Sequence, residues 1–362
     1  MEKTHGKIGT KEFIALIMLT VGTKLADSTP SILYESLGNA AWLGMAIICI
    51  LSILPLYFLT KLITHFEEKN LIDITKLLFG RYIGFIVLFI LWILQFHSLI
   101  SSSAVYVDII GSMYFTKTPI FIIYIVLMGV AAYGAKKGIE SIGSTAWITL
   151  PWIKISLLIV LVITFFQGES NFMFPILGPG EMEILKEGTM NASIFAEFFF
   201  IALLATNVKN KRVYKKGVWV AFIFVSIEFI LAFISYVMLF DYEGVKLINY
   251  PYHETIRYIQ IGFIKNVESL FFPFWLVASY IRFAVGLYIS ALLFGSLFKV
   301  KQFEYIVPAI STIVIFLGLI PEAPVFSLSY FRVIFLYIVT PIILILPFLL
   351  WATAIIKGEF KK

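Results

Sequence analysis

Long apolar runs, separated by short stretches of polar, glycine and proline residues, fill most of this 362-residue chain. A helix needs about 20 mostly apolar residues to cross a bilayer, because each residue adds about 1.5 Å. We therefore predict an all-α polytopic membrane protein with ten spans, forming a single transmembrane domain over residues 1–362. The predicted spans run approximately over residues 12–36, 40–63, 82–114, 118–135, 140–166, 190–207, 217–240, 266–297, 304–320 and 331–356.

The composition changes this picture little and excludes several classes of protein. Hydrophobic residues make up 60% of the chain and charged residues 14%, with a mean hydropathy of +0.96. Because a soluble domain carries roughly a quarter charged residues, the chain is not a soluble protein. The single cysteine, Cys49, excludes a disulfide framework, and the four histidines have no metal-binding spacing. No nucleotide-binding, hydrolase or redox motif is present, so we expect no cofactor and no enzyme activity.

The distribution of positive charge predicts the orientation in the membrane. Most of the 28 Lys and Arg residues fall in the two termini and in every second loop. Cytoplasmic loops collect Lys and Arg, so we predict both ends inside, which requires an even number of spans. Arg332 is assigned to the external loops, whereas Lys24, Lys154 and Arg282 remain within spans. The net charge of +6 then reflects a basic face toward anionic lipid and requires no nucleic acid partner.

Two connections carry structure of their own. Residues 67–80 (EEKNLIDITKLLFG) are predicted to form a short amphipathic helix along the inner surface. Residues 167–189 contain several Pro and Gly residues and are predicted to form an irregular external linker. This linker lies at the midpoint of the chain, where a five-plus-five inverted repeat would join its halves. The predicted parts are a first repeat over about 12–166, a second over about 190–356, and cytoplasmic tails over 1–11 and 357–362.

The first span is interrupted in its middle. Gly22, Thr23, Lys24 and Asp27 precede Pro30, which removes a backbone hydrogen bond. An unsatisfied backbone group costs several kcal/mol in hydrocarbon, so such a break requires burial by protein or access to water. Secondary transporters use broken helices to bind the charged groups of their substrates. We interpret Gly22, Thr23 and Lys24 as part of a ligand-binding site; the alternative is a kinked helix whose Lys24 and Asp27 pair or reach the interface.

Polar residues in other spans are candidates to complete this site. Glu197 lies among phenylalanines in residues 190–207, where it could receive a ligand's ammonium group or pair with a buried cation. His97 and Ser101 share one helical face and are candidates to line a polar cavity, and Ser279 is a further candidate opposite the first span. The alternative for such serines is close helix packing or a bond to their own backbone.

Three segments occur in a characteristic order: KIGTKEFIALIMLTVGTKLADSTP, GRYIGFIVLFILWILQFHSLISSSAVYVDII and NFMFPILGPG. Because of the order and spacing of these segments, the chain resembles the B subunit of spore germinant receptors. This is the GerAB/GerBB-type spore permease family, within the amino acid–polyamine–organocation superfamily. The resemblance covers essentially the whole chain and implies a leucine-transporter-like fold with a 5+5 inverted repeat. Two features depart from amino acid permeases of that superfamily. Gly22-Thr23-Lys24 replaces a Gly-Ser-Gly-type break, and helix six has no Gly or Pro between Asn191 and Thr206.

The resemblance implies a nutrient-sensing subunit of the spore inner membrane, with A and C subunits as partners. An amino acid or similar nutrient would bind at the break in helix one, with Glu197 as the partner of its ammonium group. Some sodium-independent members of the superfamily place a lysine of helix five where others bind sodium, and Lys154 is similarly placed. Lys154 is thus a candidate for ion substitution or proton coupling; the alternative is that it pins neighbouring helices. Two other functions stay open: a proton-coupled amino acid permease, and a ligand-gated conduit for water or ions.

Overall fold

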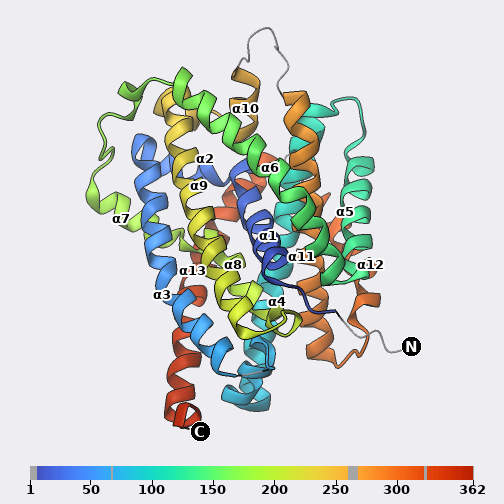
Figure 1. The fold of residues 1–362 in the computed structure, drawn as a ribbon. Coiled ribbons are helices and arrows are strands. Elements are labelled where there is room, and N and C mark those ends of the chain that lie inside the picture. The colour runs from blue at the N-terminus through green and yellow to red at the C-terminus, as the bar shows by residue number, and fades with distance from the viewer. Residues whose placement is uncertain (1–5, 67, 260–267, 322–323, 362) are drawn as a thin grey trace.

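The all-helical prediction is confirmed by the computed structural model, which describes residues 6–66, 68–259, 268–321 and 324–361. Figure 1 shows these residues as a bundle of helices, most of which run in the same direction or its reverse. No sheet occurs within these ranges, where one isolated bridge pairs Ile8 with Val208. The elements are α1 (Thr10–Gly22), η1 (Thr23–Ala26), α2 (Thr29–Leu37), η2 (Gly38–Ala40), α3 (Ala41–His65), α4 (Leu71–Ile109), η3 (Ile110–Tyr114), α5 (Ile120–Lys137), α6 (Ile139–Gln167), η4 (Ser170–Met173), α7 (Glu181–Met190), η5 (Ala192–Phe195), α8 (Ala196–Phe200), η6 (Ile201–Asn207), α9 (Lys211–Lys246), α10 (Pro251–Tyr258), α11 (Glu268–Phe298), η7 (Phe303–Ile306), α12 (Val307–Gly318), α13 (Pro324–Ile356) and η8 (Glu359–Lys361).

The number of long apolar helices establishes a multi-pass membrane protein. In the described part of the chain, seven helices are long and apolar enough to cross a membrane. The number is eight if Glu181–Met190 and Ala192–Asn207, which meet at 42°, form one bent span. Their outer faces expose large apolar side chains, such as Ile148, Trp152 and Leu158 of α6. Such faces are stable against lipid and unfavourable against water.

Most of the helix predicted over residues 67–80 is present as the first part of α4, which begins at Leu71; residue 67 lies outside the described residues. Asn70 caps it, since its side chain accepts hydrogen bonds from the backbone N–H groups of Ile72 and Asp73. The chain then kinks at Gly80, whose φ of 76° lies in the left-handed region that favours glycine. The kink turns the short amphipathic helix away from the long apolar remainder of α4.

The interruption of the first span is also present. The α-helical hydrogen bonding of α1 ends at Gly22, a 3₁₀ turn follows over Thr23–Ala26, and α2 begins at Thr29. Pro30 lies in the first turn of α2, where a missing N–H leaves no helical bond unmade. The break therefore follows directly from the local sequence.

A second interruption occurs in residues 190–207, although this segment lacks internal Gly and Pro. Its central α8 has five residues and stands between 3₁₀ turns over Ala192–Phe195 and Ile201–Asn207. The backbone N–H of Ser193 donates to Thr340 Oγ1 of α13 at 3.1 Å, and the same hydroxyl donates to the Met190 carbonyl at 2.7 Å. Side chains of a distant helix thus satisfy backbone groups that an α-helix would pair internally.

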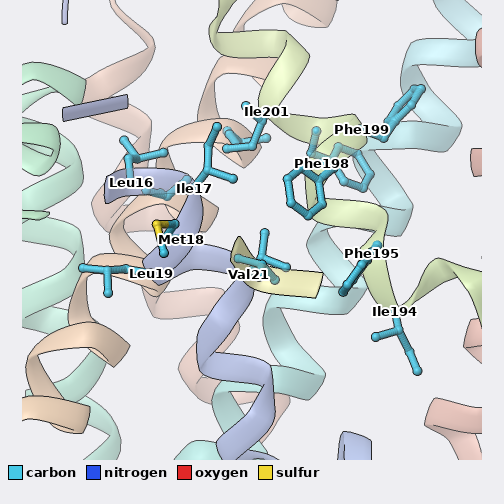
Figure 2. Packing of buried hydrophobic residues seen from close by; sticks show 14 of the residues in the cluster. Leu16, Ile17, Met18, Leu19, Val21, Ile194, Phe195, Phe198, Phe199 and Ile201 are labelled. Carbon is cyan, nitrogen blue, oxygen red and sulfur yellow. The ribbon is translucent and has the colours of Figure 1, made fainter. Parts of the chain in front are cut away.

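Helix α1 lies in the centre of the bundle and packs against α6, α8, α9 and α11. Leu16, Ile17 and Val21 are fully buried. Figure 2 shows apolar side chains of α1 beside those of the second interrupted segment, including Phe195 and Phe198. Because lipid tails are as apolar as leucine, these contacts stabilise the bundle through close van der Waals packing rather than removal from water.

Candidate ligand-binding site

A buried ion cluster joins the two interrupted helices. Lys24 of η1 donates to Glu197 Oε2 at 2.5 Å and to the Ile194 carbonyl at 2.6 Å. Arg282 of α11 donates to the other carboxylate oxygen of Glu197 at 3.2 Å and to the Thr20 carbonyl at 2.8 Å. The Glu197 carboxylate therefore lies between two cations from different helices.

A second buried ion pair lies at the C-terminal end of the break in the first span. Arg332 of α13 donates to Asp27 Oδ2 at 2.9 Å, to Ser28 Oγ at 2.7 Å and to Thr29 Oγ1 at 2.6 Å. Asp27 is fully buried, and its other oxygen accepts the Thr29 N–H at 2.7 Å. The prediction placed Arg332 among the external loop charges, and the structure corrects it. Arg332 is only 8% exposed, because the Asp27 carboxylate provides a partner inside the bundle.

These five ionisable groups carry an excess of one positive charge. Three are cations and two are carboxylates, and each contacts at least one group of opposite sign. An unpaired charge at this depth costs about 2.5–3.5 kcal/mol on insertion scales, so the pairing is needed for stability. The remaining positive charge favours an additional anionic group, such as a carboxylate, in the same layer.

Protein donors already occupy the backbone carbonyls that the break releases. Tyr106 of α4 donates its hydroxyl to the Thr23 carbonyl at 2.7 Å. Tyr236 of α9 donates to the Leu25 carbonyl at 3.4 Å. Because buried carbonyl groups need a partner, these contacts make the break stable without a ligand. They also leave these carbonyls less available to a ligand's ammonium group.

Two small cavities flank Glu197. They have volumes of about 30 and 40 Å³, and both are lined by Gln95, Ser98, Ser102, Glu197 and Phe200. The first also contacts Arg282, and the second contacts Lys24, Ser101 and Arg332. A water molecule needs about 10–15 Å³ of such space, so each cavity has room for only a few atoms. The cluster therefore borders a small space between α4, α8, α11 and α13 that is lined in part by polar side chains.

A third ion pair lies on the other side of helix one. Lys154 Nζ of α6 is 2.6 Å from Glu228 Oε2 of α9, and their side chains are 20% and 14% exposed. A Cβ atom at Gly22 would lie 3.2 Å from Lys154 Nζ, so the pair borders the break. Another cavity of about 40 Å³ is lined by Gly22, Thr23 and Lys154. Glu228 is not among the predicted site residues; a lone carboxylate in an apolar span is expected to pair with another helix, as it does here.

The predicted ligand-binding residues thus divide between two sides of helix one. Lys24, Ser101 and Glu197 come together around one cavity. Gly22 faces the opposite side, toward Lys154. Thr23 contributes to both sides, because it lines the cavity beside Lys154 while its hydroxyl accepts a bond from Arg282 at 3.3 Å.

Two further predicted residues do not line the cavities beside Glu197. The His97 ring stacks on Phe335 of α13, with ring centroids 4.2 Å apart. The Ser279 hydroxyl donates to the Trp275 carbonyl of its own helix at 2.8 Å. The polar face of α4 that does line the cavities is formed by Gln95, Ser98, Ser101 and Ser102. Gln95, Ser98 and Ser102 follow one another at spacings of three and four residues, so the sequence alone indicates that they share one helical face.

Comparison with known proteins identifies relatives along the whole chain. The family model described as "Spore germination protein" matches residues 7–327. Spore germination protein XB of Bacillus anthracis is 23% identical over 262 residues, which cover 71% of this chain and 72% of that protein. Spore germination protein GerLB of Bacillus cereus is 22% identical over 326 residues, 88% of this chain and 86% of that protein. Spore germination protein KB of Bacillus subtilis (strain 168) is 22% identical over 375 residues, 100% of this chain and 98% of that protein.

Proposed function

We propose, since this chain belongs to the spore germination protein family, that it is the nutrient-sensing subunit of a germinant receptor. A small amino-acid-like ligand binds between the two interrupted helices, and the resulting movement passes to the A and C subunits. The observation that carries this proposal is the cluster of Lys24, Glu197 and Arg282, which ties η1, α8 and α11 together beside a polar cavity.

The chemistry of the cluster matches a ligand that carries both charges. A carboxylate competes with Glu197 for Lys24 and Arg282, and an ammonium group competes with these two cations for Glu197. Such exchange replaces one set of charged contacts by another without leaving a charge unpaired. The ligand's carboxylate also compensates the excess positive charge of the five buried ionisable groups. Binding then shifts the protein toward the state in which the exchanged contacts are stronger.

The present state is the closed one in this scheme. The cavities beside Glu197 hold only a few atoms, so an amino-acid-sized ligand requires the interrupted helices to move apart. The contacts that span this gap are the Lys24–Glu197 pair and the bond from Lys24 to the Ile194 carbonyl. Loss or exchange of these contacts is the local event that a ligand would control.

We further infer ten membrane crossings with a five-plus-five inverted repeat, both termini on the spore-core side of the inner membrane. The three crossings beyond the seven long helices are α1, the bent pair of α7 with residues 192–207, and the short α12. The two interrupted segments are the first and sixth of the ten predicted spans, which are equivalent positions in such a repeat. Their shared unwinding supports the repeat.

Germination of spores tests the receptor role directly. Spores without this protein are exposed to a panel of single nutrients, in a strain that lacks redundant receptors, and we expect loss of response to one nutrient or a narrow group. Glu197→Gln keeps the shape of the side chain, removes its charge and should abolish the same response. Glu183→Gln removes a carboxylate from an exposed pair and is the matched control. A normal response of the Glu197→Gln spores, at equal protein level, would refute the site.

A second function is favoured by a separate observation, the Lys154–Glu228 pair beside Gly22. This pair is partly exposed and offers a group that can exchange a proton as helix one moves, as a proton-coupled amino acid permease requires. Counterflow of amino acids in proteoliposomes that contain the purified chain alone distinguishes the two functions. Uptake that Lys154→Gln abolishes would establish the permease, whereas absence of flux together with a nutrient-specific germination defect supports the receptor.

A further inference from the structure

A basin of about 500 Å³ lies far from the ion cluster, at the end of the bundle that carries the N-terminal segment. The lysine distribution predicts this end to be cytoplasmic. The volume falls in the range of small-molecule sites. The basin is lined by Lys7, Ile63, Phe66, Glu68, Lys69, Ala205, Thr206, Val208, Lys209, Asn210, Lys211 and Tyr214.

The charge of this lining is strongly positive. Four lysines and one glutamate are present among these lining residues, and arginine is absent from them. Within the described ranges, Lys7, Lys69 and Lys209 form no ion pair with a carboxylate. Each lysine presents a compact point charge with three donors, which suits the several oxygens of a phosphate group. The basin therefore has the electrostatic character of a phosphate site.

The backbone brings these lysines together from three separate segments. The bridge between Ile8 and Val208 is closed by Ile8 N–H to the Asn207 carbonyl at 2.9 Å and Lys209 N–H to the Ile8 carbonyl at 3.1 Å. It places Lys7 and Lys209 on one rim. Lys69 comes from the connection between α3 and α4, where its ammonium group lies 5.6 Å from the Phe66 ring centre. This convergence depends on the fold, because the three lysines are distant in sequence.

A buried polar group without a partner is an independent sign of a ligand. Tyr214 lines the basin and is 1% exposed, and its hydroxyl has no hydrogen-bond partner among the residues that the structure describes. A buried hydroxyl without a partner is unfavourable, so a ligand that accepts its hydrogen bond is stabilised. Helix α9 begins beside the basin, where the Asn210 side chain caps it by accepting the Val213 N–H at 2.9 Å.

We propose that this basin binds a phosphate-bearing anion, supplied either by a soluble phosphate compound or by a lipid headgroup. The anion contacts the ammonium groups of Lys7, Lys69 and Lys209, and one of its oxygens accepts a hydrogen bond from the Tyr214 hydroxyl. It thereby links the tail of helix one, the α3–α4 connection and the end of the second interrupted segment. Occupancy of the basin stabilises the arrangement in which these three segments lie together. They meet near the C-terminal end of η6, whereas Glu197 lies before its N-terminal end.

The test uses the full chain in nanodiscs and pyrophosphate as the soluble probe. In phosphatidylcholine nanodiscs, pyrophosphate is titrated against chloride at constant ionic strength, and the thermal unfolding temperature reports binding. We expect a saturable increase. The triple variant Lys7→Gln/Lys69→Gln/Lys209→Gln should weaken the apparent affinity at least about tenfold, because three charge-assisted contacts are lost. Tyr214→Phe, which preserves the charge, should weaken it by a few-fold.

A control variant and a lipid arm make the outcome decisive. Lys215→Gln/Lys216→Gln/Lys299→Gln removes the same charge from exposed positions outside the basin and should bind pyrophosphate like the wild type. Stabilisation by phosphatidylglycerol nanodiscs alone, lost in the basin variants, would identify the lipid headgroup as the source. An equal loss in the control variant, or no stabilisation by either source, would overturn the proposal. If the triple variant does not fold, Lys209→Gln and Tyr214→Phe provide the same comparison.

Discussion

The two interrupted helices reach a similar geometry for different reasons. In helix one, the break between Gly22 and Thr29 is caused locally, by residues that are poor in a continuous apolar helix. The segment over 191–207 contains good helix formers, and yet only Ala196–Phe200 is α-helical. Its unwinding is held by side chains from elsewhere, above all Thr340 and Lys24. An interruption can therefore be encoded by one segment or imposed on it by its neighbours.

The two segments also depend on each other. Lys24 of the first donates to the Ile194 carbonyl and to the Glu197 carboxylate of the second. The locally encoded break thus supplies part of the contacts that unwind its partner. Because of this asymmetry, substitutions in helix one should disturb the second segment more than substitutions in the second segment disturb helix one. Stability measurements on variants test this expectation.

The largest effect is expected from Glu197→Leu, which removes the carboxylate shared by both segments. Lys24 and Arg282 are then left without their common partner, and the free energy of unfolding should fall by about 3–5 kcal/mol. Thermal and denaturant unfolding of the full chain in detergent micelles measures it. The double variant Lys24→Met/Glu197→Leu should recover part of this loss, since one orphaned charge is also removed. A single-variant loss no greater than that of the exposed control Glu183→Leu would contradict the role of the cluster.

A somewhat smaller effect on stability is expected from pH, through a buried histidine beside the break in the first span. Helix α10 packs against η1, and its His253 is buried between Tyr114 and Trp275. Burial, aided by the charge of Arg257, lowers the pKa of His253 from 6.5 to about 3. The folded protein keeps this group neutral, so stability is complete above pH 6.5 and declines as the unfolded chain takes up a proton at lower pH.

Between pH 6.5 and 5 this decline should reach about 2 kcal/mol, at about 1.4 kcal/mol per pH unit. The unfolding temperature of the full chain, measured at constant ionic strength, reports the decline. His253→Gln cannot take up this proton and should flatten the profile over the same interval. An unchanged slope in this variant would assign the pH dependence to other groups.

A moderate effect is expected from Thr340→Val, which tests whether the second segment is held from outside. The substitution keeps the shape of the side chain but removes the hydroxyl that bonds Ser193 N–H and the Met190 carbonyl. We expect a loss of about 1–2 kcal/mol in the free energy of unfolding, the cost of leaving these buried groups unpaired. Thr312→Val is the matched control, because its exposed hydroxyl bonds only its own helix. Equal effects of the two variants would show that the second interruption does not need this contact.

The smallest effect is expected from Gly22→Ala, within about 1 kcal/mol in either direction. Alanine favours the helix over glycine by about 1 kcal/mol, and the new Cβ opposes this gain because it would lie 3.2 Å from Lys154 Nζ. The ammonium group is the end of a flexible side chain and can shift. Unfolding temperature measures the net result. A loss of several kcal/mol would show that the Lys154–Glu228 pair is rigidly fixed against helix one.

Much of this protein follows from its sequence alone. The length and apolarity of the runs determine a helical multi-pass membrane protein, because an unpaired backbone is too costly in lipid. Gly22 and Pro30 determine the break in helix one, because their effects on the backbone are local. The presence of Lys24, Lys154 and Glu197 within apolar spans also indicates that charges are paired inside the bundle, since each is too costly to leave alone.

Only the tertiary structure decides which charges meet. Lys24 contacts Glu197, Asp27 contacts Arg332, and Lys154 contacts Glu228, across separations of 74 to 305 residues. Such pairings depend on the spacing and rotation of packed helices, which local composition does not specify. The unwinding of residues 190–207 and the assembly of the basic basin have the same origin. In each case the decisive partner belongs to a distant segment, and only packing brings it within hydrogen-bonding or electrostatic range.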